Sequence, residues 1–562
     1  MTEINPVKHS HTSRKMLSGW RARHIREYLT GYLMIAPSMI LIFIFGIFPV
    51  GFALYVSLHK WRIKQSGFIG LDNYVRAIDN LAYILIFALG IGALLAVFFI
   101  LRKTYRTASE KTENPWLLAI PGAIHAATII ALLRWAVLLL PEFLGIADKI
   151  RGLERTRDLF LNFMMEALKA ETVLPAWRLF LLLLIAGLLS GCYFYRLRRG
   201  SRNLTYQINF TLAWLSGFIG FLLIWFTQKE ISKVYAEAVK NGTDPGIWPQ
   251  IITISAGVLL LVAAWFIWSS AEKQTTMSGF WVRVFATMAL LVGGWLLIGE
   301  IPMIVALGDK NLWSGLKVTI FFSLGTVPFQ LAISLFLSIL LFQKLHGTNF
   351  FRVVYFLPYV TPAIASAAVF KNIFSNRLTA PVNLLLRNMG LPPQKWLYEP
   401  QGIFTLLGNH FGLDIPAWAA GPSLALTVII IHSIWTYVGY DTVIYLAGLG
   451  NIPTELIDAA EVDGANKWQI FRSIIFPLLS PTTYFLSLIA IIGTFKAFNT
   501  IWIFRDSLAL GTTDTFSLVI FIEFFEKLRY GYASALAFVL FAIILSLTFI
   551  NNRIQGSRVF YG

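Results

Sequence analysis

Two hydrophobic stretches of the chain carry polar and ionisable side chains, which are energetically costly to place in lipid. They are Tyr437, Tyr440 and Asp441 in residues 422–447, and Lys496, Asn499 and Thr500 in residues 482–503. A charged group at bilayer depth costs several kcal/mol unless it is paired or reaches water, so such groups commonly mark a solute path. Two other interpretations stay open: the tyrosines could be interfacial anchors, and Asp441 with Lys496 could be a structural ion pair.

The composition indicates a membrane protein. Of 562 residues, 57% are hydrophobic and only 13% are charged, against about 25% charged in a soluble domain. Apolar runs of span length recur, which predicts an all-α polytopic membrane protein. The net charge of +17 does not indicate a nucleic-acid partner, because Lys and Arg cluster between the apolar runs. The single Cys192 can form no internal disulfide.

The apolar runs predict about twelve spans. Their expected limits are 29–58, 81–101, 116–140, 177–195, 207–227, 249–269, 282–304, 314–342, 353–374, 422–447, 482–503 and 531–550.

The connections between the spans predict the orientation. The densest basic clusters are residues 102–106, 196–202, 343–352 and 553–558, and all lie on the side of the basic tail 1–28. Basic loops stay in the cytoplasm, so both ends of the chain are expected inside. The tail lacks the features of a signal peptide. The longest outer segment, 377–420, is expected to hold an interfacial helix followed by a loop.

Several site motifs are absent from the sequence. There is no GxxxxGK[ST] phosphate loop and no CxxC or HExxH pair, so neither an ATP site nor a zinc site is expected in this chain. An integral membrane enzyme would need clustered acids or histidines at one face, and none stands out. The chain is therefore expected to be neither an enzyme nor a cofactor protein.

One segment, TELIDAAEVDGANKWQIFRSIIFPLLSP at 454–481, has the composition of a soluble module. Carboxylates in the first turn favour a helix start after Pro453. Gly464 is expected to end that helix, and Pro477 and Pro481 to mark re-entry into the membrane. Periodicity alone also fits an ordinary interfacial helix.

The segment resembles the cytoplasmic EAA loop of the permease subunits of ABC importers, a pattern of E-A-A, three residues and Gly, then a hydrophobic run to a Pro. Here it reads Asp458-Ala459-Ala460, Gly464 and Pro477, with Asp in place of the leading Glu. Three further stretches resemble the sugar-type branch of the family, in the family's order: residues 48–74, 351–370 and 434–456. Residues 28–80 and 311–562 are covered, whereas LALGTTDT at 508–515 departs from the pattern.

The resemblance implies a type I permease core of six spans. In the family the loop docks into a groove on a separate cytoplasmic ATPase. The residues that carry this role over are Glu455, Asp458, Ala459, Ala460, Gly464, Ala465 and Phe471. The implied partners are two ATPase subunits that bind ATP and Mg, a second permease that makes a heterodimer, and an extracytoplasmic solute-binding protein.

The resemblance also implies a path for a carbohydrate. Relatives of the maltose type line their sugar site at positions that match Thr436, Tyr437 and Tyr440, and about match Gly493, Lys496 and Thr500 in the next span. Aromatic faces stack on sugar rings, and amides and hydroxyls hydrogen-bond to their hydroxyl groups.

Residues 81–310 lie outside the resemblance and hold about six additional spans of unknown role. The expected organisation is a basic tail at 1–28, a first core span and amphipathic segment at 29–80, the insert at 81–310, and the permease core at 311–562. Within the insert, His125 and Arg134 lie in apolar runs, and Arg134 could reach water or Glu142. The alternative to an importer is an ion-coupled secondary transporter of twelve spans, which predicts two similar halves that this sequence does not show.

Overall fold

The computed structural model describes residues 13–111, 113–154, 156–197, 203–242, 245–271, 277–343 and 347–555. Parts of the basic connections that predicted the orientation, residues 198–202, 344–346 and 556–558, lie outside this range, as do residues 1–12 of the tail. The regular secondary structure of the described chain is helical except for one antiparallel hairpin of β1 (His59–Trp61) and β2 (Gln65–Phe68). An all-α polytopic membrane protein is confirmed.

Nine helices of the described residues are long and apolar enough to cross a membrane, and up to eleven if each of two bent pairs is one span. The bent pairs fall on the predicted spans 353–374 and 482–503. Prolines explain both bends: the first pair breaks by 94° at Thr361-Pro362, and the second by 62° between Pro477 and Pro481. The count of twelve stays a prediction.

Contacts divide the chain into two compact units, residues 1–79 with 305–562 and residues 80–304. The long helices of the first unit are α1 (Ser13–Ile42), α2 (Phe48–Ser57), α11 (Lys310–Phe342), α12 (Thr348–Val360), α13 (Ala363–Ile373), α16 (Leu424–Gly450), α20 (Ser480–Phe495) and α23 (Tyr530–Gln555). Its short helices are α3 (Asp72–Ile78), α14 (Pro381–Asn388), α15 (Ile403–Phe411), α17 (Thr454–Val462), α18 (Lys467–Ile470), α19 (Phe476–Leu478), α21 (Asn499–Phe504) and α22 (Phe516–Phe521).

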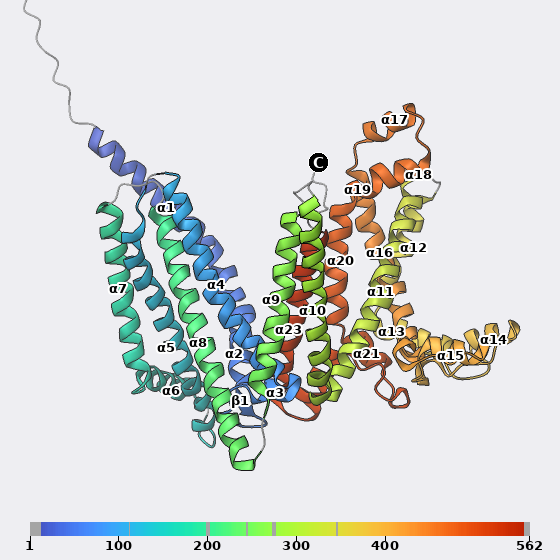
Figure 1. The fold of residues 1–562 in the computed structure, drawn as a ribbon, viewed down its shortest axis with the longest axis horizontal. Coiled ribbons are helices and arrows are strands. Elements are labelled where there is room, and N and C mark those ends of the chain that lie inside the picture. The colour runs from blue at the N-terminus through green and yellow to red at the C-terminus, as the bar shows by residue number, and fades with distance from the viewer. Residues whose placement is uncertain are drawn as a thin grey trace, which may run out of the picture. The chain divides into compact units, whose positions relative to one another are not determined.

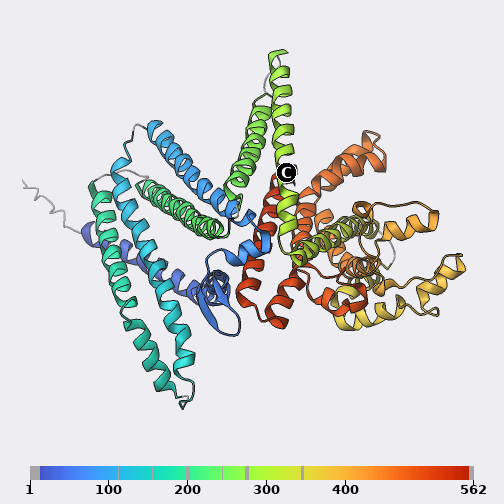
Figure 2. The same cartoon turned by 60° about the horizontal axis from the view of Figure 1, so that its bottom comes forward.

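Segment 377–420 contains two helices, where one was expected. α14 and α15 run across the direction of α11 and α16, and they stand out to the side of this unit in both views (Figures 1 and 2). Asn383 holds the segment together, because its amide donates to the Gln394 carbonyl at 3.1 Å and accepts from the Trp396 indole at 2.7 Å.

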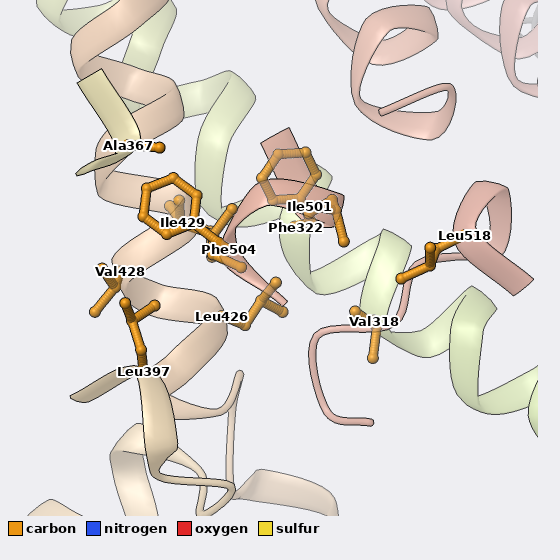
Figure 3. Packing of buried hydrophobic residues seen from close by; sticks show 11 residues of the cluster. Val318, Phe322, Ala367, Leu397, Leu426, Val428, Ile429, Ile501, Phe504 and Leu518 are labelled. Atoms are coloured by element: carbon orange, nitrogen blue, oxygen red, sulfur yellow. The ribbon is translucent and has the colours of Figure 1, made fainter. Parts of the chain in front are cut away.

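The core of the first unit gathers around α11, α16 and α21. Val318 and Phe322 of α11, Ile429 of α16, and Ile501 and Phe504 of α21 are buried together (Figure 3). This apolar cluster is what anchors the short helix α21 beside α16.

Gly439 allows α12 to cross α16 closely. A Cβ at this position would collide with the carbonyl oxygen of Tyr355 in α12. Small residues permit such backbone approach between membrane helices, and here the approach brings Tyr359 of α12 over the middle of α16.

The second unit consists of α4 (Leu81–Ser109), α5 (Ala119–Lys149), α6 (Arg157–Lys169), α7 (Val173–Leu197), α8 (Asn203–Asn241), α9 (Ile247–Ala271) and most of α10 (Met277–Leu307). α4 and α8 pack closely through Gly90 and Gly220. The His125 ring bonds to the Pro121 carbonyl of its own helix at 2.5 Å. Arg134 is exposed, and among the described residues it forms no ion pair with Glu142.

Candidate functional site

A cavity of about 370 Å³ lies between α11, α12, α16, α20 and α21. Of the predicted path residues, the ones that line it are Tyr437, Tyr440, Asp441, Gly493, Lys496, Asn499 and Thr500. Thr436 does not line it. Its hydroxyl donates to the His432 carbonyl one turn back along α16, at 2.9 Å. The fold therefore brings together side chains from two spans that are about 55 residues apart in sequence.

Three tyrosines form one wall of the cavity. Tyr359 of α12 stacks on Tyr440 with ring centroids 4.7 Å apart and planes inclined by 22°. It meets Tyr437 edge-on at 5.9 Å. The sequence analysis did not identify Tyr359, because no local pattern shows that the tyrosine within LPYVTP faces a cavity. Its position results from the crossing of α12 over α16.

Asp441 is 3% exposed and belongs to a hydrogen-bonded pair. Its Oδ2 accepts from Nε2 of Gln330 in α11 at 2.5 Å. Among the described residues it forms no ion pair with Lys496, although both line the same cavity. The interpretation of these two residues as a structural ion pair is therefore wrong, and the partner of Asp441 is an amide.

A stripe of hydroxyl and amide side chains runs along one face of α11. Its members are all buried and recur three or four residues apart: Thr319, Ser323, Thr326, Gln330, Ser334 and Ser338. Ser334 donates to the Val438 carbonyl at 3.0 Å, and Thr494 of α20 donates to Ser323 at 2.9 Å. Small polar side chains bond neighbouring helices in this way inside membranes. The signal was available in the sequence as a helical repeat of polar residues, and it was missed.

The wall formed by α20 and α21 is a broken span, whereas a continuous span was expected over 482–503. α20 ends at Phe495, and α21 begins at Asn499. Hydroxyl groups satisfy the freed backbone: Ser517 donates to the Phe495 carbonyl at 2.8 Å, and Thr515 to the Ala497 carbonyl at 3.3 Å. Irregular backbone at membrane depth is tolerated only where it is satisfied in this way or lines a cavity. The break turns Lys496 to the cavity.

The segment 454–481 forms the predicted helix, break and second helix. α17 begins at Thr454, directly after Pro453, and none of its residues is buried. Gly464 follows with φ of +81°, a left-handed conformation that suits glycine. Asn466 and Gln469 then form a reciprocal capping box that starts α18.

The predicted coupling residues lie on or beside α17. Glu455, Asp458 and Ala459 are exposed, and Val462, at 88%, is the most exposed apolar side chain of α17. Ala465 closes the turn by donating its backbone N–H to the Ala460 carbonyl at 2.9 Å. The residue farthest along the chain, Phe471, packs between Trp468 and Phe476.

The segment 454–481 connects two of the helices that line the cavity, α16 and α20. α16 leads into it at Gly450, and α20 leaves it at Ser480 (Figure 1). Its Ile457, Ile475 and Leu479 belong to one apolar cluster with Tyr445 and Leu449 of α16. The segment therefore joins two of the helices that line the cavity.

Comparison with known proteins identifies the family. Residues 330–558 match the model of the binding-protein-dependent transport system inner membrane component. A probable ABC transporter permease protein of Bacillus subtilis, YesP, is 33% identical over 257 residues, which are 45% of this chain and 75% of that protein. The chain belongs to this permease family.

Other relatives of the permease have named solutes. The sn-glycerol-3-phosphate permease protein UgpA of Rhizobium meliloti is 29% identical over 47% of this chain and 83% of its own length. The trehalose/maltose permease protein MalF of Thermococcus litoralis is 27% identical over 45% of this chain and 77% of its own length. A solved bacterial alginate ABC transporter in complex with a pentasaccharide-bound periplasmic protein matches 50% of this chain and 96% of its own, with 20% identity and a TM-score of 0.38. Similarity at that level does not define the fold.

The permease is accordingly a multi-pass protein of the inner membrane and part of a binding-protein-dependent ABC system. Its relatives are transport permeases, which are not enzymes themselves. Within the described residues, no group of three or more His, Cys, Asp or Glu side chains could hold a metal ion.

Proposed function

We propose that the permease carries a carbohydrate across the membrane as a subunit of an ATP-driven, binding-protein-dependent importer. The observation that carries this proposal is the connection between two sites: a cavity that holds polar side chains and an aromatic wall, and an exposed α17 in the segment between α16 and α20, two of the helices that line the cavity. Relatives named for sugars and polyol phosphates support the solute class.

The proposed topology has about twelve spans with both chain ends in the cytoplasm. Six spans form the type I core, within residues 29–80 and 311–562, and about six belong to the insert at 81–310. An even number of inserted spans returns the chain to the same side, so the core keeps its topology. The division of contacts at Asp79 and Val305 supports treating the insert as a separate module.

The proposed partners supply what this chain lacks. Two cytoplasmic ATPase subunits bind ATP and Mg and hydrolyse the nucleotide, and this chain holds no cofactor. A second permease completes the pore as a heterodimer, and an extracytoplasmic binding protein delivers the solute. The exposed face of α17, with Val462 and the small Ala459, is the surface proposed to seat in an ATPase groove.

Transport would proceed by alternating access. Nucleotide-driven movement of the ATPases would tilt α17. α16 would move with it because only residues 451–453 separate the two helices, and α20 would follow through α18 and α19. The cavity would open alternately to the two sides. Within it, Tyr437 and Tyr440 would stack on a sugar ring, while Asp441, Lys496, Asn499 and Thr500 would hydrogen-bond to hydroxyl groups.

Co-purification tests the proposal. The full chain is extracted in mild detergent as wild type, Gly464→Asp and Asp458→Lys, and associated proteins and ATPase activity are measured. We expect an ATPase and a second permease with the wild type, and loss of the ATPase with both variants.

Matched controls separate coupling from folding. Gly390 also has a left-handed φ, +75°, with open space around it, and Asp414 is also exposed, but both lie in the segment 377–420 and not in 454–481. Gly390→Asp and Asp414→Lys should retain the ATPase. A wild-type chain that purifies without any ATPase would contradict the proposed function.

A further inference from the structure

A second pocket lies on the other side of α21 in sequence, at its Trp502 end and in the loop that follows. It has a volume of about 450 Å³ and is lined by Trp502, Arg505, Asp506, Ser507, Leu510, Gly511 and Asp514. Trp502 belongs to α21, and the other residues belong to the loop that follows. We call it the mouth pocket.

The charged groups of the mouth pocket are held in place. Arg505 bonds to Asp514 through Nε at 3.1 Å and Nη2 at 3.4 Å, and it lies 3.9 Å from the Glu526 carboxylate. Oδ1 of Asp506 accepts from the Leu508 backbone at 3.0 Å. The loop is therefore built around fixed polar groups, and binding would cost little further ordering.

Trp502 provides an apolar surface beside these groups. Its indole is supported by Phe498, stacked at 5.9 Å, and by Phe521, edge-on at 5.1 Å. The residue nevertheless stays 41% exposed. The Arg505 guanidinium lies 5.9 Å from the centre of the same ring. Large aromatic side chains gain from being covered, so the exposed part of a ring held in this way at a pocket wall offers a surface to a ligand.

The charge balance indicates the class of ligand. The pocket lining holds one guanidinium, Arg505, against two carboxylates, Asp506 and Asp514. That guanidinium is already bonded to Asp514, so an anionic group would meet an excess of negative charge. A neutral ligand with an apolar face and many hydroxyl groups fits better, since the face can cover the indole and the hydroxyls can donate to the carboxylates.

The distance to the cavity indicates the size of the ligand. Asn499 and Thr500 line the cavity, and Trp502 lines the mouth pocket, all on the single helix α21. Asn499 and Trp502 are three residues apart, so they lie on about the same face of α21 and about 5 Å apart along its axis. Phe498, which lines the cavity, stacks on Trp502. One ligand can therefore occupy both sites.

We propose that the mouth pocket binds one neutral sugar ring of an oligosaccharide whose neighbouring ring lies in the cavity. Trp502 stacks on that ring, and Asp506 and Ser507 bond to its hydroxyl groups. The proposal rests on the proposed carbohydrate function, and it adds that the importer selects its solute by chain length.

The test is binding by the complete importer in nanodiscs as a function of chain length. The probes are malto-oligosaccharides of one to four units, with alginate oligosaccharides of equal length as an acidic series. Trp502→Ala should weaken binding of the neutral tetramer by about three- to ten-fold, the worth of one aromatic contact. Binding of the monomer should be unchanged, and Trp502→Phe should restore part of the loss.

Further variants keep the result interpretable if Trp502→Ala fails to fold. Ser507→Ala and Asp506→Asn remove polar contacts with little change of shape and should also weaken the tetramer selectively. Leu508→Ala is the matched control, because Leu508 is an exposed apolar residue of the same loop outside the pocket lining. If every variant still co-purifies with the ATPase, a loss of tetramer binding comes from the mouth pocket and does not bear on the proposed importer function.

Three results would overturn the mouth pocket as a sugar site. They are an equal loss for monomer and tetramer, no loss in any variant, and no binding of either neutral or acidic probes to a wild-type importer that retains its ATPase.

Discussion

Gln330 and Asp441 are joined by a 2.5 Å hydrogen bond that links α11 to α16 at the wall of the cavity. Asp441 is almost completely buried, and the amide of Gln330 is the donor that its Oδ2 receives. The pair thus links two helices that line the cavity.

Removing the amide should destabilise the permease. Gln330→Leu would leave a buried carboxylate without its donor, which costs about 1–3 kcal/mol. We expect a lower thermal midpoint, measured in detergent. Combining it with Asp441→Leu should recover much of the loss, because the two residues are coupled. Losses that simply add in the double variant would show that the bond contributes nothing.

Lys496 should matter for solute and not for stability. Its ammonium group makes no ion pair among the described residues, although it lines the cavity. Lys496→Met is expected to leave the thermal midpoint unchanged and to reduce solute uptake. Lys371→Met, at an exposed lysine of α13, serves as the control. A large fall in thermal midpoint for Lys496→Met would indicate a structural role.

The close crossing of α12 and α16 should not tolerate a larger residue. Gly439→Ala would place a methyl group on the Tyr355 carbonyl oxygen, and overpacking of this kind costs about 1–3 kcal/mol. The same change at Gly450, where a Cβ meets open space, should have little effect. Equal thermal midpoints for the two variants would contradict the described crossing.

The stability of the break between α20 and α21 should depend on the Ser517 hydroxyl, which bonds to the Phe495 carbonyl at the end of α20. Ser517→Ala removes the bond to the Phe495 carbonyl and should destabilise the permease by about 1 kcal/mol. Ser546→Ala is the comparison, since the Ser546 hydroxyl is exposed and bonds within its own helix. If chemical denaturation gave equally small losses of unfolding free energy for both variants, other groups would have to bond to the Phe495 carbonyl.

The proposed orientation can be measured by labelling. The chain has one cysteine, the exposed Cys192, so Cys192→Ser provides a background free of thiols. A cysteine at Asp458 should react with a membrane-impermeant reagent only in inside-out vesicles. A cysteine at Arg387 should react only in right-side-out vesicles. The reverse pattern would place α17 outside the cytoplasm.

Much of the molecule could be predicted from local pattern. Apolar runs located the helices, since about 20 apolar residues are needed to cross a bilayer. Pro453, Gly464, Pro477 and Pro481 marked the ends and bends of the segment 454–481, because proline and glycine act on the backbone through their own covalent structure. The polar side chains within segments 422–447 and 482–503 could be singled out because placing them in lipid is energetically costly.

Pairing across the fold could not be predicted in the same way. Asp441 and Lys496 looked like an ion pair because opposite charges attract, yet the crossing of α11 and α16 gave Asp441 an amide partner. Tyr359 reached the cavity only because Gly439 lets α12 approach α16. The continuous span expected over 482–503 breaks after Phe495, and Ser517, from a later helix, satisfies the carbonyl group that the break exposes.

By itself, the sequence determined the class of protein, the position of its helices and the residues that had to avoid lipid, because these follow from transfer of each segment between water and bilayer. Only the tertiary structure decided which polar groups meet, where the cavity lies and which aromatic rings line it. Those depend on helix crossings between segments distant in the chain, and no local pattern encodes the partner.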